Sequence, residues 1–312
     1  MKNKKMKTKS ITMAIAYLHI VGIVCSSAEA QTIRERLQER LSGRSAQATP
    51  KQLEAEDVQS TESAIRISPQ FEAGTRCMFI GHSFFIPIAR AFDGLAKRGE
   101  FAQHDAELIF SPGVGGSPGG LWKDKDRRKQ IEAKLSSGTV TLFGMPTASS
   151  RSKSPLKDLR NWVELATKYN PKTTFLIGQP WPAGGPRMDA GQYSQVSAKA
   201  TRTNFQAVTQ LRREFPDNRF IFIDYGRLAA DMKSQFLSSN LPEITDSVGR
   251  GSESLFRDYF MGHAGQLMTE LSAIVWLKTL YVSVPDANNR KSLSTEAKSI
   301  VEATLSHNRK FR

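Results

Sequence analysis

The chain has 312 residues and a formal net charge of +14 at pH 7, with 39% hydrophobic and 24% charged residues. This length suits one buried core, or one domain with an extension. Lys and Arg are spread along the chain without interleaved aromatic residues, which argues against a nucleic-acid-binding protein. Cys and His are not spaced as the ligands of a zinc site.

The first segment has the layout of a secretory signal peptide. Five Lys residues precede an apolar run at 11–24, and Ala28-Glu29-Ala30 places small residues where a signal peptidase reads them. The run is about fourteen residues long, whereas a membrane-spanning helix needs ~20. We therefore predict that 1–30 is removed, that the protein is periplasmic or secreted, and that no stable membrane insertion follows. A retained anchor and a lipid-modified Cys25 are the alternatives.

Residues 31–72 are predicted to form a flexible extension. Between 45 and 68 they are rich in Gln, Ser, Thr, Glu and Ala and poor in large apolar residues, so they cannot bury enough surface to offset their chain entropy. Because 1–30 carries five Lys and one Glu, the remaining chain has a charge of about +10. For an exported protein, a basic surface indicates either anionic envelope components and acidic polysaccharide as partners, or simply a solvated surface.

From residue 75 onward, short apolar runs alternate with longer amphipathic ones. The predicted strands are 76–80, 106–110, 140–143, 173–177 and 219–223, and the predicted helices are 86–99, 124–135, 156–169, 198–215 and 266–282. This alternation indicates an α/β domain with a mostly parallel five-stranded sheet and helices on both faces. We assign 73–285 to the domain, expect 238–254 to be a surface loop, and expect 286–312 to be a basic C-terminal tail. Cys77 fits a small buried residue better than a reactive thiol.

Ligands of open parallel sheets bind beyond the carboxyl ends of the strands, so residues just after the strands are the candidates for a site. Gly81-His82-Ser83 directly follows the first strand and precedes a helix. A Ser in this place has a fixed backbone and an exposed hydroxyl, as a nucleophile requires. It fits the N-cap of the helix equally well.

A glycine-rich run at 112–120 follows the second strand. Its backbone N–H groups can approach a ligand closely, as in an oxyanion hole. Phosphate binding is a second use, although no Lys-Ser/Thr follows to complete a nucleotide-binding loop. A flexible loop is the third interpretation.

A general base for Ser83 has to come from few histidines. His104 precedes the second strand and so lies at the opposite end of the sheet, His307 falls in the expected tail, and His82 is adjacent to Ser83. His263 remains, just before the last apolar helix, with Asp258 five residues earlier to orient its ring. A capping or surface His is the alternative.

The order of these features, over about 75–282, resembles the SGNH (GDSL-type) hydrolases. The resemblance implies a three-layer, flavodoxin-like fold and ester hydrolysis without metal or cofactor. It implies that Ser83 is the nucleophile and His263 the base. It also implies that Gly116 is an oxyanion donor, together with the N–H of Ser83.

Three positions depart from the family pattern, as in a divergent member. His82 replaces the Asp of the Gly-Asp-Ser turn. Residues 144–147 read Gly-Met-Pro-Thr where Gly-x-Asn-Asp is expected, so the Asn donor is missing and Gln179, after the fourth strand, is a candidate substitute. The family's acid lies three residues before the His, where this chain has Phe260. Either Asp258 reaches the His by a wider turn, or the site is a Ser-His dyad.

The pattern predicts an exported serine carboxylester hydrolase acting on a small ester or an acylated carbohydrate, such as the acetyl groups of a polysaccharide. Trp181 and Gln179 are the expected substrate-binding residues. A non-catalytic glycan-binding protein is the first alternative, with Trp181 as the stacking residue and Trp122 as a second choice. An acyltransferase with the same Ser and His is the other. Trp162 and Trp276 fall in helical patterns and are expected in the core.

Overall fold

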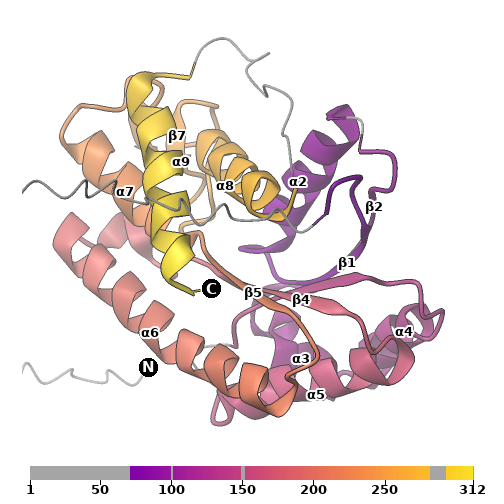
Figure 1. The fold of residues 1–312 in the computed structure, drawn as a ribbon. Helices are drawn as coiled ribbons and strands as arrows, with labels where there is room; N and C mark the ends of the chain where they lie inside the picture. Colours follow the sequence, from indigo (N-terminus) through magenta and orange to yellow (C-terminus); the bar gives the residue numbers. More distant parts are fainter. Residues whose placement is uncertain (1–70, 100, 149–151, 282–292, 312) are drawn as a thin grey trace, which may run out of the picture. The chain divides into compact units, whose positions relative to one another are not determined.

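A computed structural model describes residues 71–99, 101–148, 152–281 and 293–311 (Figure 1). All the described residues belong to one compact unit. The predicted signal peptide 1–30 and nearly all of the predicted extension 31–72 lie outside the described residues. No helix in the described ranges is long and apolar enough to cross a membrane.

The centre of the domain is a sheet of five parallel strands: β1 (Arg76–Gly81), β2 (Asp105–Phe110), β3 (Leu142–Pro146), β4 (Thr174–Gln179) and β5 (Phe220–Asp224). Their order is β2-β1-β3-β4-β5, which is the flavodoxin-like order, with its switch point between β1 and β3. The predicted fold class is therefore confirmed. All five predicted strands exist, and β3 is displaced toward its C-terminal side because Gly144 and Pro146 hide its end from strand propensity.

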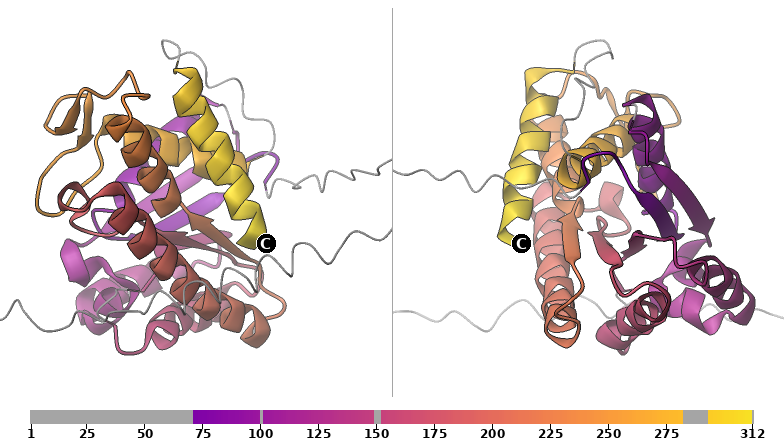
Figure 2. Two further views of the ribbon diagram at one scale, coloured as in Figure 1. Left: turned by 90° about the vertical axis from the view of Figure 1, so that its left-hand side faces the viewer. Right: turned by 45° about the vertical axis from the view of Figure 1, so that its right-hand side comes forward.

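Helices cover both faces of the sheet, which makes three layers (Figures 1 and 2). One face packs against α2 (Ile86–Arg98), α7 (Gly226–Leu237), α8 (Gln266–Leu280) and α9 (Thr295–Asn308). The other packs against α3 (Pro118–Lys123), α4 (Lys125–Leu135), α5 (Pro155–Tyr169) and α6 (Ala190–Glu214). Successive β1 residues alternate between the two layers: Phe79 joins the first core and Ile80 the second. Burial on both faces explains why the strands are continuously apolar.

The structure contains helices that the apolar pattern does not reveal. The glycine-rich run holds the short helix η1 (Gly113–Gly116) and then α3, in which Ser117 is the N-cap and accepts the Gly120 N–H at 3.2 Å. A Cβ at Gly120 would lie 2.3 Å from the Val114 carbonyl oxygen, so glycine is required there for close packing and not for flexibility. Helix α7 is also absent from the predicted elements. The expected loop 238–254 contains β6 (Asp246–Val248), which pairs with β7 (Ser254–Phe256).

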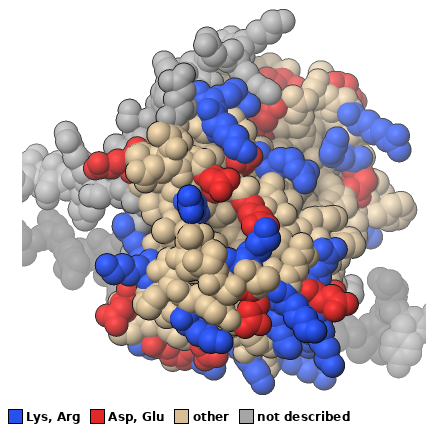
Figure 3. All heavy atoms as spheres, turned by 90° about the vertical axis from the view of Figure 1, so that its right-hand side faces the viewer, with Lys and Arg blue, Asp and Glu red and all other residues tan. Residues whose placement is uncertain are grey.

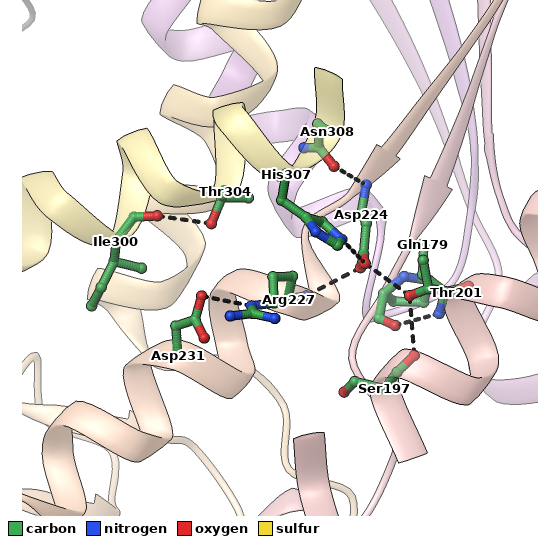
Figure 4. Close-up of polar contacts among 11 residues, drawn as sticks. Gln179, Ser197, Thr201, Asp224, Arg227, Asp231, Ile300, Thr304, His307 and Asn308 are labelled. Carbon is green, nitrogen blue, oxygen red and sulfur yellow. Dashed lines mark hydrogen bonds and ion pairs between the residues drawn. The ribbon is translucent and has the colours of Figure 1, made fainter. Parts of the chain in front are cut away.

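The expected C-terminal tail is corrected by α9, which packs into the domain through buried Ala297, Ile300 and Val301. Its end is tied to the sheet (Figure 4): His307 Nε2 lies 3.1 Å from Asp224 Oδ2, and Asn308 Oδ1 accepts the Asp224 N–H at 3.0 Å. The basic residues at 309, 310 and 312 led to the prediction of a tail, whereas the helix before them has one Lys and two Glu. The domain thus extends to the short helix η4 (Arg309–Phe311).

Asp224 is the centre of this attachment and is 3% exposed. Thr201 Oγ1 also donates to its Oδ2 at 2.8 Å, and the Arg227 N–H donates to its Oδ1 at 3.1 Å. Asp224→Ala leaves these buried donors without an acceptor, so we expect the free energy of unfolding to fall by about 3 kcal/mol in urea titrations. Asp231→Ala is the control, because its ion pair with Arg227 lies at the surface and should change stability by less than about 1 kcal/mol. Equal losses in the two variants would show that Asp224 does not hold α9.

Candidate active site

Ser83 lies in the turn between β1 and α2, at the switch point of the sheet. The chain reverses sharply there, since the N–H groups of Phe85 and Ile86 both donate to the His82 carbonyl at 3.0 Å. The N-cap residue of α2 is Phe85, and no side chain caps this helix. The alternative interpretation of Ser83 as an N-cap is therefore wrong, and its hydroxyl is available for another partner.

That partner is His263. Its Nε2 lies 2.8 Å from Ser83 Oγ, and its Nδ1 lies 2.5 Å from Asp258 Oδ2. An Nδ1–H donated to the carboxylate leaves Nε2 unprotonated, so that it can accept the Ser83 hydroxyl proton. Helix α8 begins after its N-cap Gly265, without a side-chain cap, so His263 is not a capping residue. The three side chains come from two segments that are distant in sequence and meet at the carboxyl edge of the sheet.

Asp258 is held by the backbone of the turn that follows it. Its carboxylate accepts the N–H groups of Met261 at 2.6 Å, Gly262 at 3.2 Å and His263 at 3.1 Å. Partial burial by itself would raise the pKa of Asp258. The hydrogen bonds from these N–H groups and from the His263 side chain have a larger, opposite effect, so the pKa falls below its usual value to about 2. The carboxylate is thus ionised at neutral pH. The turn closes through Gly262, whose φ of +73° is unfavourable for other residues.

Aromatic side chains pack against His263 and its turn. The Phe84 ring meets the His263 ring edge to face at 5.1 Å, and Trp181 stacks on Phe84 at 5.2 Å. Trp181 Nε1 donates to the Gly262 carbonyl at 2.9 Å. With only 2% of its surface exposed, Trp181 presents no free face for a sugar. The prediction that it binds substrate is corrected by this burial, and its position fits support of the His263 turn.

Gln179, predicted as a substitute oxyanion donor, is 4% exposed and engaged at both ends. Its Nε2 donates to the Pro180 carbonyl and its Oε1 accepts from Asn204 Nδ2, each at 2.7 Å. The amide therefore serves the contact between β4 and α6, and the donor role is corrected. Trp122 packs edge to face on Trp162 at 5.0 Å. Trp162 and Trp276 are buried as expected.

Gly116 lies against the Ser83 turn. A Cβ on this residue would stand 2.2 Å from the Ser111 carbonyl oxygen and 2.7 Å from His82 Cα. Only glycine allows the glycine-rich segment to approach the chain so closely. The position fits the predicted oxyanion donor, and that role remains a prediction.

His82 has a property that the sequence does not reveal. Its Nδ1 accepts the Phe84 N–H at 3.2 Å, which places the ring proton of the neutral form on Nε2. Burial and the neighbouring His263 lower the pKa of His82 to about 4. A neutral ring thus lies next to the nucleophile at physiological pH. No signal in the sequence distinguishes this state from that of an ordinary surface histidine.

The lowered pKa of His82 predicts a pH-dependent stability. The unfolded chain takes up a proton on this ring near pH 6.5 and the folded chain only near pH 4, so the contribution is complete above pH 6.5 and is lost as the pH falls toward 4. We expect a loss of up to about 3 kcal/mol in unfolding free energy between pH 7 and pH 4 from this group. His82→Asn keeps an acceptor for the Phe84 N–H without titrating. Urea titrations should show a shallower pH dependence for this variant, and identical slopes would contradict the assignment.

Among the described residues, no group of three or more His, Cys, Asp or Glu side chains is placed to hold a metal ion. Cys77 is buried, and burial raises the pKa of its thiol.

No protein-family model and no curated protein matches the sequence. The solved structures that are similar in fold include the following two. One is a GDSL-like lipase from Parabacteroides merdae ATCC 43184, with a TM-score of 0.44 and 11% identity, covering 68% of this chain and 97% of the other. The other is the periplasmic domain of a lipopolysaccharide acetyltransferase from Salmonella ser. Paratyphi A, with a TM-score of 0.37 and 11% identity, covering 67% of this chain and 84% of the other.

The five parallel strands in their flavodoxin-like order agree with the fold that the resemblance in the sequence implies. Fold and site together define a class of protein: a doubly wound parallel sheet with a Ser-His-Asp hydrogen-bonded chain at its carboxyl edge. Because a fold can host many activities, function has to be argued from the site.

Proposed function

We propose that the protein is a serine carboxylester hydrolase that works outside the cytoplasm, with Ser83 as nucleophile. The observation that carries this proposal is the unbroken hydrogen-bonded chain from Asp258 through His263 to Ser83. Adjacent hydrogen bonds of this kind, in which a third group orients the base, are typical of an activated nucleophile.

In the proposed reaction, Ser83 Oγ attacks the ester carbonyl carbon while His263 Nε2 takes the hydroxyl proton. The N–H groups of Ser83 and Gly116 stabilise the oxyanion. The tetrahedral intermediate collapses, and the alcohol leaves with the proton from His263, so that an acyl group remains on Ser83. Water then attacks the acyl carbon, His263 takes the water proton and returns it to Ser83, and the carboxylic acid is released.

The substrate is proposed as a small ester or an acylated carbohydrate. The narrower proposal, removal of acetyl groups from a polysaccharide, is not supported by Trp181, because this side chain is buried and cannot stack on a sugar. The positive net charge adds little support for an acidic polysaccharide as substrate, because Lys and Arg side chains are interspersed with Asp and Glu on the face shown in Figure 3. Export is supported by the basic and apolar pattern of 1–30. The proposed catalytic chemistry depends neither on a polysaccharide substrate nor on export.

The proposal is tested with p-nitrophenyl acetate and a fluorophosphonate probe. The wild-type chain should hydrolyse the ester and acquire one covalent phosphonate adduct on the peptide that contains Ser83, because only an activated serine reacts with the probe. Ser83→Ala should lose both, whereas Ser234→Ala, at an exposed position on α7, should retain both. Hydrolysis by Ser83→Ala at the wild-type rate would refute the proposal. Adding an acceptor alcohol and separating the products distinguishes a hydrolase from an acyltransferase.

A further inference from the structure

The turn that positions His263 also carries three exposed apolar side chains. Tyr259, Phe260 and Met261 are 54%, 71% and 44% exposed. Seven large hydrophobic side chains are exposed among the described residues, and five of them lie either in this turn or in the segment at the end of β2. The other two of the five are Phe110, which pairs with Gly81 in the sheet, and Val114 in η1. Exposed apolar side chains therefore gather in the two segments beside Ser83.

The backbone of this turn is fixed, although its side chains are exposed. The Gly184 N–H donates to the Met261 carbonyl at 2.9 Å, and Arg187 Nη2 donates to the Phe260 carbonyl at 3.3 Å. Asp258 holds the turn from inside through the Met261 N–H. The three side chains are thus presented outward by a rigid support. Contiguous apolar side chains held in water in this manner are typical of a surface that a partner covers.

Two exposed arginines adjoin the turn that carries these side chains. Arg187 is exposed and binds the turn through the Phe260 carbonyl, and Arg257 is exposed and directly precedes Asp258. Apolar side chains flanked by arginines are suited to the boundary between the acyl chains and the phosphate groups of a lipid bilayer.

We propose that Tyr259, Phe260 and Met261, together with Arg187 and Arg257, form a docking surface for an anionic lipid bilayer. The apolar side chains enter the headgroup region, and the two guanidinium groups lie at the lipid phosphates. Docking brings the mouth of the Ser83 site to the membrane surface. A second copy of the chain is a poorer occupant, because a two-fold contact would bring the arginines of both copies together. A sugar is also a poorer occupant, since these three apolar side chains offer a single hydroxyl group.

The test is co-sedimentation of the full chain with vesicles of ether-linked phosphatidylglycerol or ether-linked phosphatidylcholine. Phe260→Ser/Met261→Ser should lower the partition coefficient on the anionic vesicles by about tenfold or more. Arg187→Gln/Arg257→Gln should lower it by about fivefold for each arginine replaced. Leu237→Ser is the matched control, because Leu237 is 57% exposed at the end of α7 and should leave the partition coefficient unchanged. All variants share the apolar run at 11–24, so its contribution is common to them.

The proposal is overturned if the Phe260/Met261 variant sediments like the wild type, or if the wild type binds the neutral vesicles as well as the anionic ones. It is also overturned if that variant changes self-association in size-exclusion chromatography while its sedimentation with vesicles stays the same. Ether-linked lipids contain no ester bond, so the measurement is independent of turnover. Failure here leaves the proposed ester hydrolysis untouched, and failure of that activity leaves lipid binding untouched.

Discussion

His263→Ala is expected to lower kcat/KM for p-nitrophenyl acetate by about 10³–10⁴-fold. The imidazole is the group within hydrogen-bond distance of Ser83 Oγ, at 2.8 Å. Without it, the hydroxyl has no base to take its proton and the leaving alcohol has no acid to supply one. KM should change little, because the ring acts on protons and not on substrate binding. The measurement is steady-state hydrolysis, with the unfolding free energy of the same preparation to show that the variant is folded.

His307→Ala is the matched control for this variant. His307 is a second histidine paired with a carboxylate, since its Nε2 lies 3.1 Å from Asp224 Oδ2, but it belongs to the attachment of α9 and not to the site. It should lose stability and keep its activity per folded molecule. If His263→Ala retained more than about a tenth of wild-type activity, proton transfer by this ring would not be a major part of catalysis.

The sheet could be predicted from the sequence because its strands are continuously apolar and separated by amphipathic helices. Their order could not be derived from the residues alone, because right-handed crossovers allow more than one order, but it agrees with the flavodoxin-like fold that the resemblance implies. Helix α3 could not be predicted in this way, since the sequence Pro-Gly-Gly at its start has poor helix propensity. It forms because Ser117 caps it and because its glycines allow close packing. Helix α9 was concealed for another reason: its few buried apolar residues are separated by polar and charged ones, and the basic residues 309, 310 and 312 follow directly after it.

Ser83 and His263 could be predicted as site residues because of their positions in the sequence. Ser83 comes after the first strand, and His263 comes before the last apolar helix. The role of Asp258 could not be settled in the same way, since the outcome depends on the path of the turn between it and the histidine. Burial explains why the substrate-binding roles predicted for two residues do not agree with the structure. Gln179 is the last residue of β4 and Trp181 follows it, at the edge where ligands commonly bind, but packing against Phe84 and α6 withdraws both from the surface. Local sequence contains no information about such tertiary contacts.

Asp258→Asn separates the triad from the dyad. The amide of the substituted side chain keeps an oxygen that can accept the Met261 and Gly262 N–H groups, so the turn should survive, with a loss of about 1 kcal/mol in unfolding free energy. Its NH₂ group, however, faces His263 Nδ1 and cannot accept a proton from it. The ring then adopts the other tautomer, with the proton on Nε2, and can no longer accept the Ser83 hydroxyl proton. We expect kcat to fall by about 10³–10⁴-fold.

Asp258→Ala provides the comparison, because it removes both the acceptor for Nδ1 and the acceptors for the turn. It should be as inactive as Asp258→Asn and less stable by about 2 kcal/mol or more. Steady-state rates and urea titrations on both variants therefore separate orientation of the ring from support of the turn. If Asp258→Asn kept its rate within about tenfold of the wild type, the site would work as a Ser-His dyad. The five-residue spacing would then be a feature of the turn alone.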